Sequence, residues 1–215
     1  MNKLYFYTGN ENKLKELSSE FKNNNINYNI IMQNVDIPEI QSVLNEEVIK
    51  HKLNYVKSNF MTNGDLYTKS FIVEDTGLYI DNMNSFPGAL IKSYLNYLQP
   101  NGISKFNGGS NAQAETWIGL WDNNTQQEYY FVGKVKGIIS KNPLGTNGFG
   151  YDSIFSPFII NEYQTQTQTE NNNLYHSIIN DDCKTYAQFN DIEKAMCNMR
   201  TIAGYKLGQH IKNYI

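Results

Sequence analysis

The sequence predicts an α/β fold with a mixed β-sheet, and three observations support this prediction. Strand-like and helix-like segments alternate in the first part of the chain, as in folds whose helices cover a sheet. Two strand-like segments, 114–121 and 128–135, flank a turn-forming stretch at 122–125, which indicates an antiparallel hairpin. The C-terminal residues 190–215 have a helical pattern, in one or two pieces.

The N-terminal elements follow one another with short turns. Residues 3–7 are typical of a strand, and a turn at 8–10 leads into a helix over 11–22, whose apolar side chains recur at helical spacing. A second strand is expected over 28–35 and a second, longer helix over 45–60. This alternation, followed by the hairpin, indicates an α/β fold with a mixed sheet.

The stretch 71–78 carries the strongest chemical signal. Three apolar, β-favouring residues lead into the adjacent acids Glu74 and Asp75, and Gly77 allows a tight turn directly afterwards. At a fraying strand end both carboxylates can reach one cleft, where they suit a Mg²⁺ ion that also binds substrate phosphates. The alternative is a capped strand with one solvated acid and one turn-forming Asp75.

Two further features lie in the second half. A turn at 86–88 precedes a helix expected over 89–98, and residues 145–150 form a glycine-rich loop. Residues 158–184 contain a polar, low-complexity run, so we expect a flexible insertion there. No linker divides the chain, and 1–215 is expected to be a single domain.

Composition excludes several classes of function. With 18 basic and 21 acidic residues the net charge is −3 and no basic stripe is present, which argues against a polymeric nucleic acid as partner. No apolar run approaches membrane-spanning length. Cys183 and Cys197 lack metal-binding spacing and give little case for a disulfide, so a reducing cytoplasm is the expected location.

The first strand–turn–helix is a candidate phosphate site. Free N–H groups and the helix dipole at a helix N-terminus favour anions, and Gly9, after Thr8, permits close backbone approach. Asn10 can donate a hydrogen bond to a phosphate oxygen, and Lys13 can add charge. The alternative is an ordinary turn in which Asn10 only caps the helix.

Other charged residues are weaker candidates when taken singly. Glu39 follows a rigid proline and can supply a third carboxylate, while Lys52 and Lys92 can contact phosphates. Each is by default a solvated side chain. Arg200 is the only arginine in the sequence and can make planar, bidentate contacts that lysine cannot; the alternative is a surface arginine without a specific role.

The loop that ends at residue 152 can form a nucleobase pocket. Phe149 and Tyr151 flank Gly150, and Asp152 follows. Aromatic faces stack on bases, and a neighbouring carboxylate can read a base edge. The alternative is that both rings only fill the core.

Taken together and in order, these segments resemble the inosine triphosphate pyrophosphatase family. The resemblance extends over nearly the whole chain, through short motifs that are individually weak. They include Thr8-Gly9-Asn10-x-x-Lys13, Val73-Glu74-Asp75-Thr76-Gly77-Leu78, Phe86-Pro87-Gly88-Ala89 and Phe149-Gly150-Tyr151-Asp152.

The resemblance implies a single elongated domain with two lobes around a deep central cleft, often paired as a homodimer. It further implies cleavage of ITP, dITP or XTP to the monophosphate and pyrophosphate, which removes non-standard nucleotides. The implied cofactor is Mg²⁺, with Mn²⁺ as a substitute. Such an enzyme is a hydrolase of acid anhydrides.

The resemblance also assigns roles to residues of this chain. Asp75 would activate the attacking water, and Glu39, Glu74 and Asp75 would hold the metal. The nucleotide would be bound by Thr8, Gly9, Asn10, Lys13, Lys52, Lys92, Phe149, Gly150, Tyr151, Asp152, Lys194, Met199 and Arg200.

One departure affects base selection. The family has Ser-His-Arg where this chain has Asn198, Met199 and Arg200. Asparagine can replace serine as a helix N-cap, but methionine removes a polar group that could bind the purine oxygen. Met199 can instead be a packing residue. Two alternatives therefore stay open: a pyrophosphatase of different or broader specificity, and a non-catalytic nucleotide-binding protein.

Overall fold

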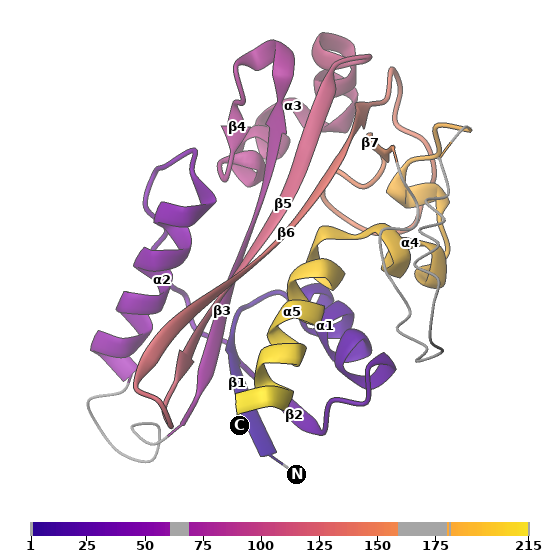
Figure 1. Ribbon diagram of the computed structural model, residues 1–215. Helices are drawn as coiled ribbons and strands as arrows, with labels where there is room; N and C mark the ends of the chain where they lie inside the picture. The colour runs from indigo at the N-terminus through magenta and orange to yellow at the C-terminus, as the bar shows by residue number, and fades with distance from the viewer. Residues whose placement is uncertain (1, 61–68, 159–179, 181, 215) are drawn as a thin grey trace.

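The computed structural model describes residues 2–60, 69–158, 180 and 182–214. Within them the chain forms a seven-stranded sheet in the order β2-β1-β3-β5-β6-β7, with β4 paired to β3 (Figure 1). The strands are β1 (Asn2–Tyr7), β2 (Tyr28–Gln33), β3 (Phe71–Ile80), β4 (Pro87–Gly88), β5 (Asn111–Asp122), β6 (Gln127–Ile139) and β7 (Phe155–Pro157).

The sheet is mixed, as the sequence predicts. Strands β2, β1 and β3 run parallel, whereas β3, β5, β6 and β7 pair in antiparallel fashion. The long β5–β6 hairpin is confirmed, and its turn at 123–126 lies one residue after the expected 122–125.

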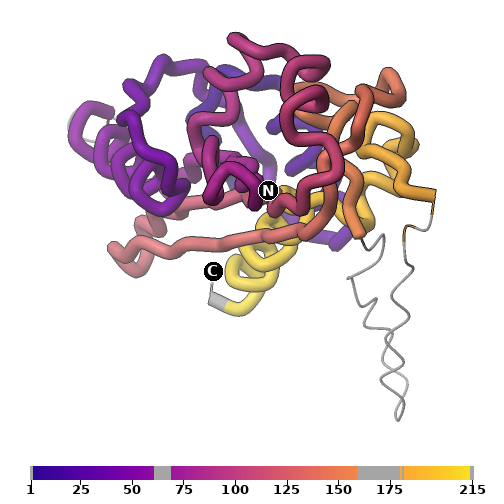
Figure 2. Tube along the Cα trace, turned by 90° about the horizontal axis from the view of Figure 1, so that it is seen from above, coloured from indigo at the N-terminus to yellow at the C-terminus, as the bar shows by residue number. Residues whose placement is uncertain are grey.

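Helices cover both faces of this sheet. They are α1 (Glu11–Asn23), α2 (Asn45–Phe60), α3 (Ile91–Asn107), α4 (Asp191–Cys197) and α5 (Met199–Tyr214), with 3₁₀ turns at Asp81–Met83 and Tyr186–Gln188. Helix α2 lies on one side of the β5–β6 hairpin, and α5 lies on the other, next to α1 (Figures 1 and 2). Helix α5 approaches β6 closely because residue 133 is glycine: a Cβ there would lie 1.8 Å from the Met199 carbonyl oxygen.

On each face of the sheet, the covering helices bury an apolar cluster. Leu17 and Phe21 of α1 pack with Leu207 of α5 and the sheet residue Ile72. On the opposite face, Leu53 of α2 belongs to a second cluster, which includes side chains of β1, β3 and β5. A fully buried side chain of this kind contributes about 1.5–3 kcal/mol, so these helices are held firmly against the sheet.

The course of β3 differs from the sequence prediction. The prediction of a tight turn after Asp75 is wrong, because β3 continues through Gly77 to Ile80. Strand β5 pairs with β3 along its whole length, whereas β1 pairs with it only as far as Val73. The two acids therefore lie inside a long strand, at the point where its β1 edge becomes free.

Helix α3 also extends further than expected. The predicted segment 89–98 stops short of a kink at Gln99, which has a φ of 57°, and the helix then continues to Asn107. The kink precedes Pro100, which disfavours helical backbone in the residue before it.

The remaining expectations have mixed outcomes. The C-terminal segment is helical in two pieces, as predicted. Most of the expected insertion 158–184 lies outside the described residues. The arrangement of two lobes around a deep cleft stays a prediction. Among the described residues, no helix combines the length and apolar character that crossing a bilayer requires.

Candidate functional site

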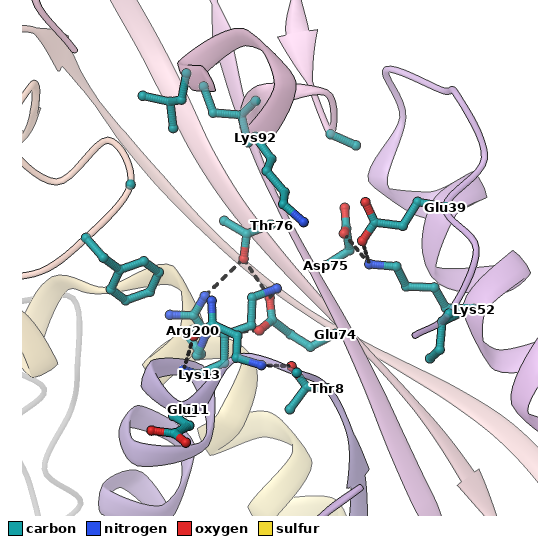
Figure 3. Close-up of a pocket in the computed structure, with 18 of the residues that line it drawn as sticks. Thr8, Glu11, Lys13, Glu39, Lys52, Glu74, Asp75, Thr76, Lys92 and Arg200 are labelled. Carbon is teal, nitrogen blue, oxygen red and sulfur yellow. Dashed lines mark hydrogen bonds and ion pairs between the residues drawn. The ribbon is translucent and has the colours of Figure 1, made fainter. Parts of the chain in front are cut away.

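A pocket of about 680 Å³ opens where β1 ends and its pairing with β3 stops. Because β1 is absent beyond this point, side chains from both faces of β3 can reach the same space. All the site residues selected from the sequence line this pocket: Thr8, Gly9, Asn10, Lys13, Glu39, Lys52, Glu74, Asp75, Lys92, Phe149, Gly150, Tyr151, Asp152, Lys194, Met199 and Arg200. Figure 3 shows part of this set, with Lys92 extending from α3 toward the acids.

The turn between β1 and α1 forms one wall. The side-chain oxygen of Asn10 accepts hydrogen bonds from the backbone N–H groups of Asn12 (3.0 Å) and Lys13 (3.3 Å). The backbone N–H of Asn10 donates to the Thr8 hydroxyl at 3.1 Å. Asn10 is therefore a helix cap, as one sequence interpretation held, and its amide NH₂ group can also donate to an anion at the helix N-terminus.

On the α2 side, one ammonium group joins two carboxylates. Lys52 Nζ lies 2.8 Å from Glu39 Oε1 and 2.7 Å from Asp75 Oδ1 (Figure 3). Burial lowers the pKa of Lys52, but the two carboxylates outweigh this effect and raise it. For Asp75 burial is the larger effect, and its pKa is raised even though Lys52 and Lys13 lower it. Asp75 is thus the acid of the pair that is better suited to take up a proton.

Glu74 projects to the other face of β3 and has different partners. Its carboxylate accepts hydrogen bonds from the Thr76 hydroxyl (2.6 Å) and Arg200 Nε (3.1 Å), and it lies 3.3 Å from Lys13 Nζ. Arg200 also binds Glu16 on α1. Burial raises the pKa of Glu74, but Arg200 and Lys13 together lower it to about 2. Glu74 therefore remains a negative charge that ties β3 to α1 and α5.

This division bears on the expected metal site. The described residues contain no group of three or more histidine, cysteine, aspartate or glutamate side chains that could hold one metal ion. Glu74 is occupied by Arg200, Lys13 and Thr76, whereas Glu39 and Asp75 converge on the single positive charge of Lys52. A donor set of two carboxylates completed by phosphate oxygens suits Mg²⁺. Glu39 and Asp75 fit that simpler site, and the participation of Glu74 in the metal site stays a prediction.

The opposite end of the pocket has an aromatic wall and a second charge cluster. Lys194 Nζ lies 2.8 Å from Asp152 Oδ2, 3.0 Å from Glu16 Oε1 and 5.2 Å from the centre of the Phe149 ring. Asp152 also accepts the Phe149 backbone N–H at 2.7 Å. Burial raises the pKa of Asp152 although Lys194 opposes this. The face of such a ring can stack on a base, and the charged groups beside it can bind the edge of that base.

The residues that replace the family's Ser-His-Arg have distinct environments. Asn198 caps α5, because its side-chain oxygen accepts the Arg200 backbone N–H at 2.7 Å. Met199 is only 3% exposed and belongs to an apolar cluster. The guanidinium of Arg200 binds Glu74, Glu16 and Thr76, so its assigned contact with the base stays a prediction.

Sequence reasoning missed several side chains that organise the pocket. Glu16 lies one helical turn after Lys13, and this spacing could have revealed it. Thr76 lies within the recognised motif, but its hydrogen bond to Glu74 could not be anticipated. Asn45 donates to Asp75 at 2.6 Å and has no sequence signal beyond its place at the start of a helix.

The pocket combines a helix N-terminus that can bind an anion with clustered lysines and carboxylates and an aromatic side chain. On a mixed sheet, these features are typical of a protein that binds a phosphorylated nucleotide. The Ham1 family model matches residues 4–210, and the chain belongs to the Ham1 family. The family resemblance inferred from the sequence is confirmed by the curated relatives.

Three relatives illustrate the match. The inosine triphosphate pyrophosphatase of Saccharomyces cerevisiae is 35% identical over 165 residues, which cover 73% of this chain and 80% of the relative. The dITP/XTP pyrophosphatase of Pyrococcus horikoshii is 30% identical over 158 residues, covering 72% and 79%. The inosine triphosphate pyrophosphatase of Schizosaccharomyces pombe is 27% identical over 217 residues, covering 98% and 95%.

Solved structures support the fold. A Ham1 protein from Coxiella burnetii matches with a TM-score of 0.70 at 20% identity, covering 99% of this chain and 100% of that chain. The Staphylococcus aureus Ham1 protein matches with a TM-score of 0.64 at 22% identity, covering both chains fully.

Proposed function

We propose that this protein hydrolyses non-standard purine nucleoside triphosphates, namely ITP, dITP and XTP, to the monophosphate and pyrophosphate. One observation carries the proposal: a single pocket is lined by Lys13, Lys92 and a helix N-terminus together with the Glu39–Lys52–Asp75 cluster. The names of the relatives at 30–35% identity support the same reaction.

The triphosphate is bound along the wall formed by α1, α2 and α3. The N-terminus of α1 and Lys13 bind phosphate oxygens from one side, and Lys52 and Lys92 bind them from the other. Lys92 lines the pocket, its charge helps to lower the pKa of Glu39, and no ion pair joins it to another described residue, so this side chain is available for a phosphate. With these contacts we infer that the α–β phosphoanhydride bond lies in front of Asp75.

Asp75 orients a water molecule and removes its proton as the water attacks phosphorus. General-base assistance of this kind contributes typically ~10²–10⁴ in rate. The lysines neutralise charge on the departing pyrophosphate. Glu39 and Asp75 would hold Mg²⁺, or Mn²⁺ in its place, and the bound ion would supply further charge neutralisation at the phosphates.

The base is read at the other end. Phe149 provides an aromatic face for stacking, beside Tyr151, which is largely buried in the core, and Asp152 and Lys194 provide an acceptor and a donor. We further propose that the protein acts in the cytoplasm and forms a homodimer. Size-exclusion chromatography with light scattering tests the second of these proposals, because it measures the molar mass in solution.

A pyrophosphatase of broader specificity is the second candidate. It is favoured by Met199, which is buried in an apolar cluster at the position where the family has histidine. Such a protein would discriminate poorly between 6-oxo and 6-amino purines.

The assay is pyrophosphate release from ITP, dITP, XTP, GTP and ATP, each with Mg²⁺, with Mn²⁺ and with a chelator. We expect release that requires the metal and is fastest with ITP, dITP or XTP. Equal rates with ATP and GTP would favour the broader enzyme. Tight nucleotide binding without release from any triphosphate would leave only the non-catalytic nucleotide-binding protein.

A further inference from the structure

The side of the Asp75 carboxylate that faces away from Lys52 is also occupied. Asn45, the first residue of α2, is 1% exposed, and its Nδ2 donates to Asp75 Oδ2 at 2.6 Å. Lys52, from the same helix, holds Oδ1 at 2.7 Å. Each carboxylate oxygen therefore has its own donor, and the carboxylate cannot rotate about its terminal bond without losing both contacts.

The orientation of the Asn45 amide is fixed by Tyr79. The Tyr79 hydroxyl donates to Asn45 Oδ1 at 2.7 Å and accepts the backbone N–H of Asn45 at 3.1 Å. With the amide oxygen facing a hydroxyl donor, the NH₂ group faces Asp75. A flipped amide would place its oxygen against a carboxylate. Burial raises the pKa of Tyr79 to about 12, so the hydroxyl keeps its proton near neutral pH.

Gly77 provides the space for this amide. Side chains two residues apart project from the same face of a strand, so Asp75, position 77 and Tyr79 lie in a row on β3. A Cβ at position 77 would lie 2.1 Å from Asn45 Oδ1. The amide therefore sits where a side chain would otherwise be, between the acid and the phenol.

We propose that Asn45, oriented by Tyr79 and accommodated by Gly77, is a positioning residue that fixes the Asp75 carboxylate for attack on the nucleotide. None of the three residues lines the pocket, so each acts through Asp75. The proposal rests on the proposed function, in which Asp75 activates water. A reacting group displaced by 1 Å can lose about 10²-fold in rate.

The test compares Tyr79→Phe, Asn45→Ala and the double variant under saturating and limiting ITP. We expect kcat to fall about 3–10-fold in Tyr79→Phe, the usual effect of one hydrogen bond, and about 10–100-fold in Asn45→Ala, with KM nearly unchanged. In the double variant, Tyr79→Phe has no further effect, because its hydroxyl acts through the amide.

Tyr94→Phe is the matched control. It removes another half-buried tyrosine hydroxyl, which contacts Met83 and Asn107 outside the pocket, and it should leave kcat unchanged. Unchanged kcat in both test variants, a change in KM alone, or additive losses in the double variant would each overturn the proposal.

A readout independent of turnover separates this proposal from the proposed function. The side-chain NH₂ resonance of Asn45, identified by its loss in Asn45→Ala, should shift and exchange faster with solvent in Tyr79→Phe. An unchanged resonance would overturn the positioning role. A shifted resonance in a protein that hydrolyses no triphosphate would refute the proposed function and, with it, the catalytic purpose of the arrangement.

Discussion

Glu74 and Asp75 are neighbours in sequence and yet belong to two different environments. Glu74 faces α1 and α5, where Lys13 and Arg200 surround it and its pKa falls to about 2. Asp75 faces α2, where it has one cation and one amide, and its pKa is raised by burial. Because successive side chains of a strand project to opposite faces of the sheet, two adjacent acids can have different surroundings. Here one acid is a permanent structural charge and the other can accept a proton.

The difference follows from the number of cations on each side. A buried carboxylate that is surrounded by cations stays ionised, whereas burial with less compensation favours its neutral form. Arg200, the only arginine in the chain, is used on the Glu74 side, where its planar guanidinium contacts both Glu74 and Glu16. The Asp75 side keeps a lysine, whose partners are Asp75 and Glu39.

Asp75→Asn gives the largest expected effect on activity. Without a base the kcat for ITP should fall about 10²–10⁴-fold, while the dissociation constant for the nucleotide without a metal ion changes little. Steady-state kinetics and calorimetric titration measure the two quantities. Full activity in this variant would remove Asp75 from the role of base.

Glu74→Gln should instead reduce stability. Removing one partner of a buried ion pair typically costs about 3–5 kcal/mol, because Arg200 and Lys13 lose their shared carboxylate and only Glu16 still pairs with Arg200. For a chain of this size each kcal/mol lowers Tm by about 2–4 °C, which differential scanning calorimetry resolves. A Tm equal to that of the wild type would mean that the Glu74 network contributes nothing to stability.

The contrast between these two variants is itself a control. Asp75→Asn removes a charge of the same sign from the next residue on the same strand. We expect it to lower Tm much less than Glu74→Gln does. Similar losses of Tm in the two variants would contradict the assignment of a structural role to Glu74 and a catalytic role to Asp75.

Glu20 tests the same reasoning on an acid that has no cation. It is buried on α1 beside Asn24, and burial raises its pKa to about 7. The folded state therefore binds a proton more tightly than the unfolded chain, so stability falls as pH rises from 4.5 toward 7. Glu20→Gln should raise Tm by a few degrees at pH 8, by the same size scaling of about 2–4 °C per kcal/mol, and should have little effect at pH 5. An equal change at both pH values would show that titration of Glu20 is not the cause.

Met199→His gives the smallest expected effect, and it concerns the base. A restored imidazole can bind the purine oxygen, which at about 0.5–1.5 kcal/mol per hydrogen bond predicts a preference for ITP over ATP that rises about 2–10-fold. The ratio of kcat/KM values for the two nucleotides measures this. An unchanged ratio would make Met199 a packing residue only.

Local sequence patterns predicted much of the fold. Helix α2 begins and ends at the expected residues, because its apolar spacing is regular. The length of β3 was missed because it depends on pairing with β5, whose residues 112–121 are distant in the sequence. The sequence also placed Glu74 and Asp75 together but could not assign them different partners, since these come from α1, α2 and α5.

The most direct test of this division of roles is a crystal structure of the protein with Mg²⁺ and a non-hydrolysable ITP analogue. The account predicts the metal at Glu39 and Asp75, the triphosphate among Lys13, Lys52 and Lys92, and Glu74 still paired with Arg200. A metal ion bound by Glu74, with Arg200 displaced, would contradict it.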